Sequence, residues 1–378
     1  MRKLVGISVP FIVILTLATG CSFGAKDAVT DLDDPPVNYI EEGEDLGLEG
    51  EEGTESEREV DEGNEEGAEE GEEESEEADE DQEPAEEGAE ANERELYLFD
   101  ANGMVVPQTL PLPKSDGVMQ QSLEYLVQDG PVQELLPSGF QAVLPAGTEV
   151  SVNLMEDEET AVADFSPEFN EYNPEHEQEM LQAITWTLTQ FDGVEQIKLL
   201  VNGHELKEMP HSKTPIGDSL SRANGINLES NQVTDMTNSS DVTVYFLGSE
   251  GEGNYYVPVT RRVENSEDHL ATAIEQLING PALGTSLVTE MNQNIELLEE
   301  PTVNDGTVTL NFNESILTEH EATAVSSSVL DMLALTLTEQ EGVSDIAIEV
   351  DGEANVMAEN GKEVESVVRP DQINPHPL

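Results

Sequence analysis

Two stretches of the chain share nearly the same pattern of apolar, polar and glycine positions. In residues 187–205, a Thr-Leu-Thr sequence is followed by a turn at Gly193, a run that alternates apolar and polar residues, and an Asn-Gly dipeptide. Residues 336–353 repeat this order, with Gly342 in the turn and Asp-Gly after the alternating run. Alternation predicts a half-buried strand, and Asn-Gly or Asp-Gly predicts a tight turn after it. The chain therefore contains a tandem repeat.

The elements that precede these stretches are also predicted twice. Each unit starts with two short strands, over 96–99 and 105–107 in the first unit and over 244–247 and 256–259 in the second. A helix follows in both, because apolar residues recur at i, i+4, i+7 and i+8. These residues are Met119, Leu123, Leu126 and Val127 in the first unit and Leu270, Ile274, Leu277 and Ile278 in the second.

Both of these helices are expected to end at a Gly-Pro dipeptide, at Gly130-Pro131 and Gly280-Pro281. Glycine adopts the left-handed conformation that caps a helix, and proline prevents the helix from continuing. We therefore interpret Gly130, Pro131, Gly193, Gly280, Pro281 and Gly342 as structural turn residues shared by the repeats.

Each unit is completed by a hairpin, a second helix and the repeated strand. The hairpin strands are predicted over 148–154 and 160–165 in the first unit, and over 295–303 and 307–312 in the second. A short repeated segment closes each unit. In this segment Arg222 of the first unit corresponds to Arg369 of the second, and Asn227 corresponds to Asn374. The apolar positions of the second helices are Met180, Leu181, Ile184 and Leu188, matched by Val329, Leu330, Leu333 and Leu337.

This order of elements predicts an α+β fold, because it lacks regular strand–helix–strand alternation. Each repeat is expected to be a mixed, mainly antiparallel sheet with two helices on one face. The predicted domains are 96–229 and 243–378, and the polar segment 230–242 joins them. Each repeat has about 135 residues, enough for a core of its own.

The beginning of the chain has the features of an export signal. Arg2 and Lys3 precede a short apolar run, which ends in small residues before Cys21, the only cysteine. Residues 1–21 resemble a bacterial lipoprotein signal, and the resemblance implies that Cys21 becomes the lipidated N-terminus, carrying acyl chains such as palmitate. The alternative for Cys21 is a buried structural cysteine. An intramolecular disulfide is excluded because there is no second cysteine.

Composition changes sharply between the signal and the first repeat. From Glu41 to Glu95 the chain has 30 acidic residues in 55 positions, against two arginines. Such a segment buries too little apolar surface to offset its ordering entropy. We therefore predict that residues 22–95 form a disordered acidic tether. Its role is either to hold the repeats away from an anionic membrane or simply to remain solvated.

The acidic character extends into the repeats. The net charge is −69, and residues 96–378 carry 49 acidic and nine basic residues. This balance argues against nucleic-acid binding, which requires a basic surface. It also disfavours direct docking on anionic lipids or anionic wall polymers.

The search for a reaction centre gives no positive result. The sequence has no nucleophile-elbow or phosphate-loop motif, and the six histidines lack metal-ligand spacing. Asp164 corresponds to Asn311, so an acid–base role at that position would not repeat, and Trp186, which corresponds to Leu335, is interpreted as a packing residue. Carboxylate pairs for glycoside chemistry remain an alternative, because acids are so numerous. We predict a non-enzymatic protein without cofactor or metal.

The repeats resemble the GerMN domain of sporulation and germination proteins. The resemblance rests on the aromatic first strand with Val-Pro, the helix ending in Gly-Pro, and the Thr-Leu-Thr turn followed by an alternating strand. It implies a role in sporulation and spore germination on the outer face of the cell membrane, and it supplies no catalytic residues. The order of elements is also similar to ring-building domains of secretion systems and sporulation channels.

We therefore expect a lipid-anchored, extracytoplasmic scaffold with protein partners in an envelope complex between mother cell and forespore. The first alternative is a peptidoglycan-binding or cortex-modifying protein of the spore wall. The second is a chaperone-like or sensory lipoprotein of the envelope.

Overall fold

The computed structural model describes residues 91–229, 237–250, 253–318 and 324–375. The predicted lipoprotein signal with Cys21 and most of the predicted acidic tether lie outside these ranges. All of the described residues belong to one compact unit. No helix in the described part of the chain is both long and apolar enough to cross a membrane.

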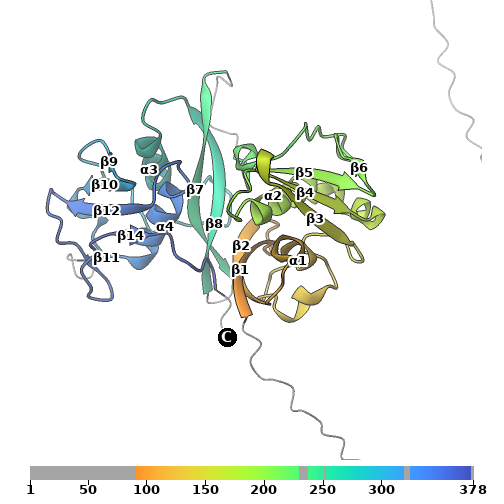
Figure 1. The fold of residues 1–378 in the computed structure, drawn as a ribbon. Coiled ribbons are helices and arrows are strands. Elements are labelled where there is room, and N and C mark those ends of the chain that lie inside the picture. The colour runs from red at the N-terminus through yellow and green to blue at the C-terminus, as the bar shows by residue number, and fades with distance from the viewer. Residues whose placement is uncertain (1–90, 230–236, 251–252, 319–323, 376–378) are drawn as a thin grey trace, which may run out of the picture. The chain divides into compact units, whose positions relative to one another are not determined.

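The first repeat consists of a hairpin, a four-stranded sheet and two α-helices (Figure 1). The hairpin β1–β2 is a separate antiparallel sheet. The other sheet has the order β3-β4-β5-β6, with β4 and β5 parallel and the outer pairs antiparallel. The helices and strands of the first repeat are β1 (Ala91–Phe99), β2 (Val105–Pro113), α1 (Val118–Glu124), β3 (Val150–Met155), β4 (Thr160–Phe165), α2 (Glu177–Leu188), β5 (Gln196–Val201) and β6 (His204–Glu205).

The second repeat has the same plan. The hairpin β7–β8 pairs antiparallel, and a sheet of order β14-β12-β10-β9 contains one parallel pair, β10 with β12. Its elements are β7 (Ser239–Glu250), β8 (Gly253–Glu264), α3 (His269–Asn279), β9 (Thr302–Asn304), β10 (Thr307–Phe312), β11 (Ala324–Val325), α4 (Ser327–Leu337), β12 (Asp345–Val350), β13 (Met357–Ala358) and β14 (Val367–Val368). The predicted α+β class with mixed sheets is confirmed.

Short 3-10 helices lie in the connections of both repeats. In the first repeat, two of them precede α2, and another lies within the closing segment that contains Arg222 and Asn227. They are η1 (Pro131–Glu134), η2 (Glu156–Glu158), η3 (Pro167–Glu171), η4 (Pro174–His176) and η5 (Arg222–Asn224), with η6 (Glu314–Ile316) in the second repeat.

The repeated Thr-Leu-Thr sequence has the same structural role in both copies. Thr187 and Thr336 are fully buried in α2 and α4. Their hydroxyls accept hydrogen bonds from the backbone N–H groups of Tyr97 and Tyr245, each at 3.1 Å. A buried N–H without a partner would be costly, so each threonine fixes its helix against the first strand of its hairpin.

The turn after each repeated strand also forms as predicted. Asn202 and Gly203 both have positive φ, as do Asp351 and Gly352, as in a type I′ turn. The side chains of Asp164 and Asn311 accept the N–H groups of Gly203 and Gly352, at 2.9 and 3.0 Å. The exchange of Asp164 for Asn311 therefore preserves a turn contact.

The end of the first helix differs from the prediction. Helix α3 stops at Gly280, whose φ is +75°, but α1 stops at Glu124, well before Gly130. Gly130 has φ −89° and is not left-handed. The carbonyl of Leu126 instead accepts the N–H groups of Val143 and Leu144, so tertiary pairing replaces the last helical turn.

Three predicted boundaries shift as well. Strand β1 starts at Ala91 and so includes the last five residues assigned to the tether, and β7 starts at Ser239, inside the predicted linker. Both additions extend hairpins whose partner strand is equally long. Strand β9 covers only the end of 295–303, because Pro301 lacks the N–H that would continue the ladder.

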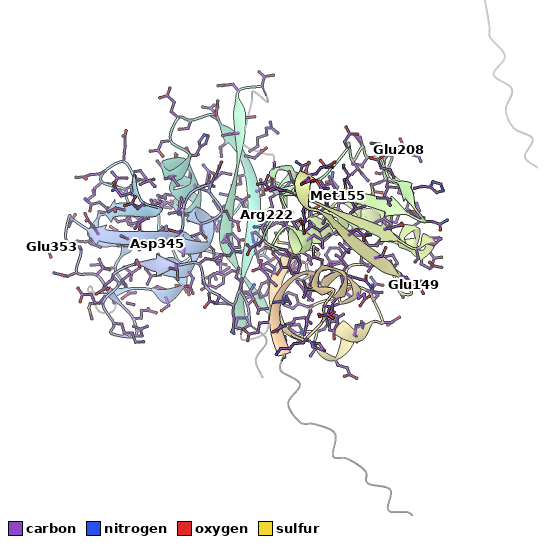
Figure 2. The ribbon with its side chains drawn as sticks, in the orientation of Figure 1. Glu149, Met155, Glu208, Arg222, Asp345 and Glu353 are labelled. Carbon is purple, nitrogen blue, oxygen red and sulfur yellow. The ribbon has the colours of Figure 1, made fainter. Side chains whose placement is uncertain are left out.

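The buried apolar side chains of the two repeats are continuous with one another. One cluster of buried apolar side chains contains residues of both repeats, from Leu96 in β1 to Val364 before β14. Acidic side chains such as Glu149, Glu208 and Glu353 project outward from this unit (Figure 2). The repeats fold as similar chains but share their interior.

Candidate functional site

The two closing asparagines bind the repeats to each other. Asn227 donates from its side-chain amide to the carbonyl of Val105 in its own repeat, at 2.8 Å, and to that of Pro258 in the other, at 2.7 Å. Its Oδ1 accepts the N–H of Val105 at 2.9 Å. The repeated closing segment that contains Asn227 therefore connects two strands, β2 and β8, through hydrogen bonds.

Asn374 makes the corresponding contacts with the repeats exchanged. Its amide donates to Tyr256 in its own repeat at 2.9 Å and to Pro107 in the other at 2.8 Å, and its Oδ1 accepts the N–H of Tyr256 at 2.7 Å. Each asparagine thus contacts its own hairpin and the opposite one. This is the self-complementary pattern of a two-fold dimer, here within one chain.

Backbone pairing reinforces both contacts. Thr109 donates its N–H to the carbonyl of Ile373 at 3.0 Å, while its hydroxyl accepts the N–H of Ile373 at 2.9 Å. Thr260 and Ile226 repeat this exchange at 2.8 and 2.9 Å. Both threonines are buried, so these bonds are shielded from water.

A charged cluster lies between the repeats. Arg222 of the first repeat and Arg369 of the second each contact Glu339 at 2.8 Å, and Arg369 also lies 3.5 Å from Glu95. Tyr245 donates its hydroxyl to Glu339 at 2.9 Å. The side chain of Glu339 is only 9 % exposed. A buried carboxylate is stable in the charged form only when paired in this way.

Burial and charge act in opposite directions on Glu339. Burial alone would raise the pKa of this carboxyl group, but the guanidinium groups of Arg222 and Arg369 and the Tyr245 hydroxyl outweigh it. The pKa of Glu339 therefore lies below its ordinary value, and the group is ionised. An ionised, fully paired carboxylate holds structure and is not poised as a general acid.

Trp186 packs into the same region. Its ring is buried, lies 5.6 Å from the ring of Tyr97, and has the guanidinium of Arg222 4.4 Å above it. Its Nε1–H donates to the carbonyl of Gly225 at 3.4 Å. The predicted packing role of Trp186 is confirmed.

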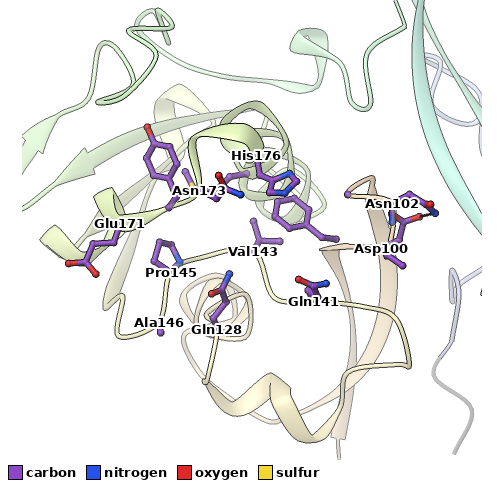
Figure 3. Close-up of a pocket in the computed structure, with 15 residues that line it drawn as sticks. Asp100, Asn102, Gln128, Gln141, Val143, Pro145, Ala146, Glu171, Asn173 and His176 are labelled. Atoms are coloured by element: carbon purple, nitrogen blue, oxygen red, sulfur yellow. Dashed lines mark hydrogen bonds between the residues drawn. The ribbon is translucent and has the colours of Figure 1, made fainter. Parts of the chain in front are cut away.

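A cavity of about 620 Å³ lies in the first repeat (Figure 3). It lies between the β1–β2 turn, the segment after α1, and the 3-10 helices before α2. Figure 3 shows Gln128 and Gln141 on one wall and Asn173 and His176 on the opposite wall. Phe99, Val143, Pro145 and Met180 contribute apolar surface to the lining.

The β1–β2 turn at the cavity edge is held by Asp100. Its Oδ1 accepts the N–H groups of Asn102 and Met104, both at 2.8 Å, and its Oδ2 accepts the amide of Asn102 at 3.2 Å. Tyr255 of the second repeat donates its hydroxyl to the same Oδ2 at 2.8 Å. Asp100 is buried, so the second repeat helps to fix this edge.

The opposite wall is fixed by Glu177, the first residue of α2. Its carboxylate accepts the hydroxyls of Tyr172 and Ser212. Burial, followed by the hydrogen bond to Glu177, raises the pKa of Tyr172 to about 12. Burial opposes ionisation of Glu177 itself, but the hydroxyl donors outweigh it and lower the pKa of Glu177. The wall that carries Asn173 and His176 is therefore preorganised.

The remaining predicted site residues have structural positions. Gly193 and Gly342 are left-handed, with φ +79° and +80°. A Cβ on Gly130 would lie 2.9 Å from the carbonyl oxygen of Val127. Pro131 opens a 3-10 helix, and Pro281 follows the end of α3. Cys21 lies outside the described residues, so its lipidation stays a prediction.

The four histidines in the described part of the chain lie apart from one another. His204, His211 and His269 are exposed, whereas His176 is half-buried with its ring 5.4 Å from that of Phe99. The described residues contain no group of three or more histidine, cysteine, aspartate or glutamate side chains arranged to hold a metal ion.

Sequence reasoning missed the cavity and the charged cluster. The sequence predicts a repeated closing segment that contains Arg222, Asn227, Arg369 and Asn374, but it does not show what these residues contact. The only indication was that the two pairs are separated by the same number of residues. The cavity residues gave no such signal, because glutamine and asparagine are common in surface loops.

Comparison with known proteins agrees with this architecture. The Germane family model, described as sporulation and spore germination, matches residues 95–207 and 243–356. The spore germination protein GerM of Bacillus subtilis (strain 168) is 50% identical over 285 residues, which cover 74% of this chain and 78% of that protein. The solved tandem GerMN domains of the sporulation protein GerM from Bacillus subtilis superpose with a TM-score of 0.72 at 49% identity, covering 76% of this chain and 100% of theirs. The chain belongs to the sporulation and spore germination family and contains two tandem GerMN domains.

Proposed function

We propose that this protein is a lipid-anchored, extracytoplasmic and non-enzymatic assembly component of a sporulation envelope complex. The observation that carries the proposal is the fusion of two GerMN domains into one unit with a shared core. Such a unit is a stable block whose outer sheets are available for lateral contacts. Membership in a sporulation and spore germination family gives the biological setting.

The buried ionisable residues support a structural role. Glu339 forms ion pairs with two arginines, Asp100 accepts four hydrogen bonds, and Glu177 accepts hydrogen bonds from two hydroxyls. A general acid or base needs an available proton site near a substrate. These carboxylates instead hold elements together, which favours a scaffold over an enzyme.

The outer sheets end in short strands with exposed apolar residues. Val303 in β9 is 50 % exposed and Val368 in β14 is 61 % exposed, and these strands are the two edges of the second sheet. Exposed strand edges offer unpaired backbone groups to a neighbour. They are the surfaces through which we expect partners or further copies to bind.

Photo-crosslinking in sporulating cells tests this assignment. A photoreactive residue at Val303 or Val368 should crosslink to an envelope protein or to a second copy. The same residue at Leu228, which is 53 % exposed but belongs to neither sheet, is the matched control. Equal labelling at Leu228, or none at either edge, would contradict lateral assembly.

The lipid anchor is tested separately. Cys21→Ala should shift the full-length protein from the membrane fraction to the soluble fraction, because the acyl chains would be missing. Unchanged fractionation of the variant would refute the anchor without affecting the assembly proposal.

A further inference from the structure

We propose that the cavity of the first repeat binds an uncharged, amide-bearing saccharide, such as an N-acetylated glycan. This goes beyond the assembly role and does not depend on it. The volume of about 620 Å³ is within the usual range for small-molecule sites, which combine apolar surface with a few polar groups.

The polar groups facing the cavity are mainly neutral amides. Gln141 forms no side-chain hydrogen bond with any other described residue, and Gln128 forms only a long one, 3.4 Å to the carbonyl of Ala142. Asn173 uses its Oδ1 on the N–H of Glu175 at 3.1 Å, which leaves its amide N–H groups available. Each amide can both donate and accept, as recognition of hydroxyl and acetamido groups requires.

The charges around the cavity disfavour anionic ligands. No lysine or arginine lines it, and the strongly acidic chain repels anions. The carboxylate of Asp100 is saturated by four hydrogen bonds, so Glu171 is the carboxylate left at the rim for a cation. A neutral ligand fits this lining best.

The backbone at the cavity disfavours an extended peptide. Phe99 and Gln141 exchange both of their backbone hydrogen bonds, at 3.1 and 2.9 Å, and the N–H of Gln128 donates to the carbonyl of Leu144 at 2.9 Å. A peptide that adds to a sheet needs free backbone groups at an edge. Recognition must therefore use the polar side chains of the lining, since Phe99 and Met180 are buried beneath it.

The turn at the cavity edge and the wall opposite the two glutamines are fixed before a ligand arrives. Asp100 and its four donors hold the turn, and Glu177 with its two hydroxyl partners holds the segment that bears Asn173 and His176. A preformed site loses less conformational entropy on binding. Asn173 is therefore held beside the cavity before a ligand arrives, while the exposed Gln128 and Gln141 can adjust to the ligand.

Calorimetric titration of the full-length protein in detergent micelles with N-acetylglucosamine di- and trisaccharides tests the proposal. The wild type should bind these sugars and should bind maltotriose, which lacks amides, more weakly. Gln141→Leu and Gln128→Leu should each weaken binding about five- to tenfold, as expected for one lost neutral hydrogen bond. Gln293→Leu, at an exposed site in the second repeat, should bind like the wild type.

Two results would overturn the proposal. One is the absence of saccharide binding by the wild type at millimolar concentration. The other is that both glutamine variants bind the saccharides as tightly as the wild type does, while their melting curves match that of the wild type. If Gln141→Leu does not fold, the exposed Gln128→Leu decides the question. Tighter, Gln128-dependent binding of an unglycosylated peptide would replace the saccharide with a peptide ligand.

Discussion

Equivalent positions after the repeated Thr-Leu-Thr carry Gln190 in the first repeat and Glu339 in the second. Gln190 forms hydrogen bonds with the backbone of Glu95 and Thr187, both in its own repeat. Glu339 instead binds Arg222 from the first repeat and Arg369 from the second. Both repeats have the same backbone pattern here, but only the second repeat has a charged side chain, Glu339, that contacts both repeats.

This asymmetry means that the two repeats are not equivalent energetically. A change at Gln190 affects contacts within one repeat, whereas a change at Glu339 affects both at once. Four sets of variants test how far the shared centre differs from the rest of the molecule.

Glu339→Gln, which makes the second repeat like the first, should have the largest effect. Arg222 and Arg369 would then lie against a neutral amide while largely shielded from water. We expect the free energy of unfolding to fall by about 2–4 kcal/mol, less than for fully buried pairs because both arginines are partly exposed. Denaturant unfolding of the full chain measures this.

Glu341→Gln is the charge-matched control, because Glu341 is exposed. The pKa of Glu339 is depressed in the folded state, so its contribution is present above the unfolded value of about 4.3 and is lost as pH falls through the folded value. The gap between wild type and Glu339→Gln should be constant from pH 7 to 5 and narrow below about pH 4. A gap that widens on acidification would contradict this.

Asn227→Ala and Asn374→Ala should follow, each lowering the free energy of unfolding by about 2–3 kcal/mol. Each substitution removes three hydrogen bonds between buried strands and places alanine at a positive φ, 46° or 51°. Thermal and denaturant unfolding compare them with Asn355→Ala, at an exposed position. If the pseudo-two-fold arrangement is energetically symmetric, the two losses should agree within about 1 kcal/mol.

Tyr255→Phe should cost about 1–2 kcal/mol. It removes the buried hydroxyl that joins the second repeat to Asp100 at 2.8 Å, while Asp100 keeps its three donors in the first repeat. Tyr125→Phe, where the hydroxyl has no hydrogen-bond partner among the described residues, is the control for equilibrium unfolding. Identical stabilities of the two variants would show that this bridge contributes nothing.

Lys207→Met should have the smallest effect, with unfolding curves that nearly coincide with those of the wild type. Lys207 lies 2.6 Å from Glu205 and 2.7 Å from Asp218, but its side chain is 52 % exposed. Water and salt screen such a pair, so adding salt should remove even this difference. A loss as large as that of Glu339→Gln would erase the distinction between the centre and the periphery.

The parts of the fold that the sequence predicted are those governed by local periodicity. Helices α2 and α4, the strands β5 and β12, and their Asn-Gly and Asp-Gly turns form where the apolar spacing and turn chemistry placed them. Side chains only two to four positions apart decide such elements.

Features governed by distant contacts were not predicted. The early end of α1 depends on pairing between Leu126 and Leu144, and the shared core depends on contacts across about 150 positions. The cavity gathers residues from Phe99 to Met180 without regular spacing. Periodicity carries no information on which loops will face each other, so this site became visible only with the fold.

The beginning and the end of the described unit lie side by side. Gln372 donates to Glu93, and Thr109, opposite Glu95 in β1, pairs with Ile373. The folded chain is therefore nearly a closed circle, opened at one of two related junctions. Folding alone does not require that the first repeat precede the second in the gene. Under the proposed lipid anchoring at Cys21, that order determines which hairpin adjoins the N-terminal segment, and so which repeat is nearer to the anchor along the chain.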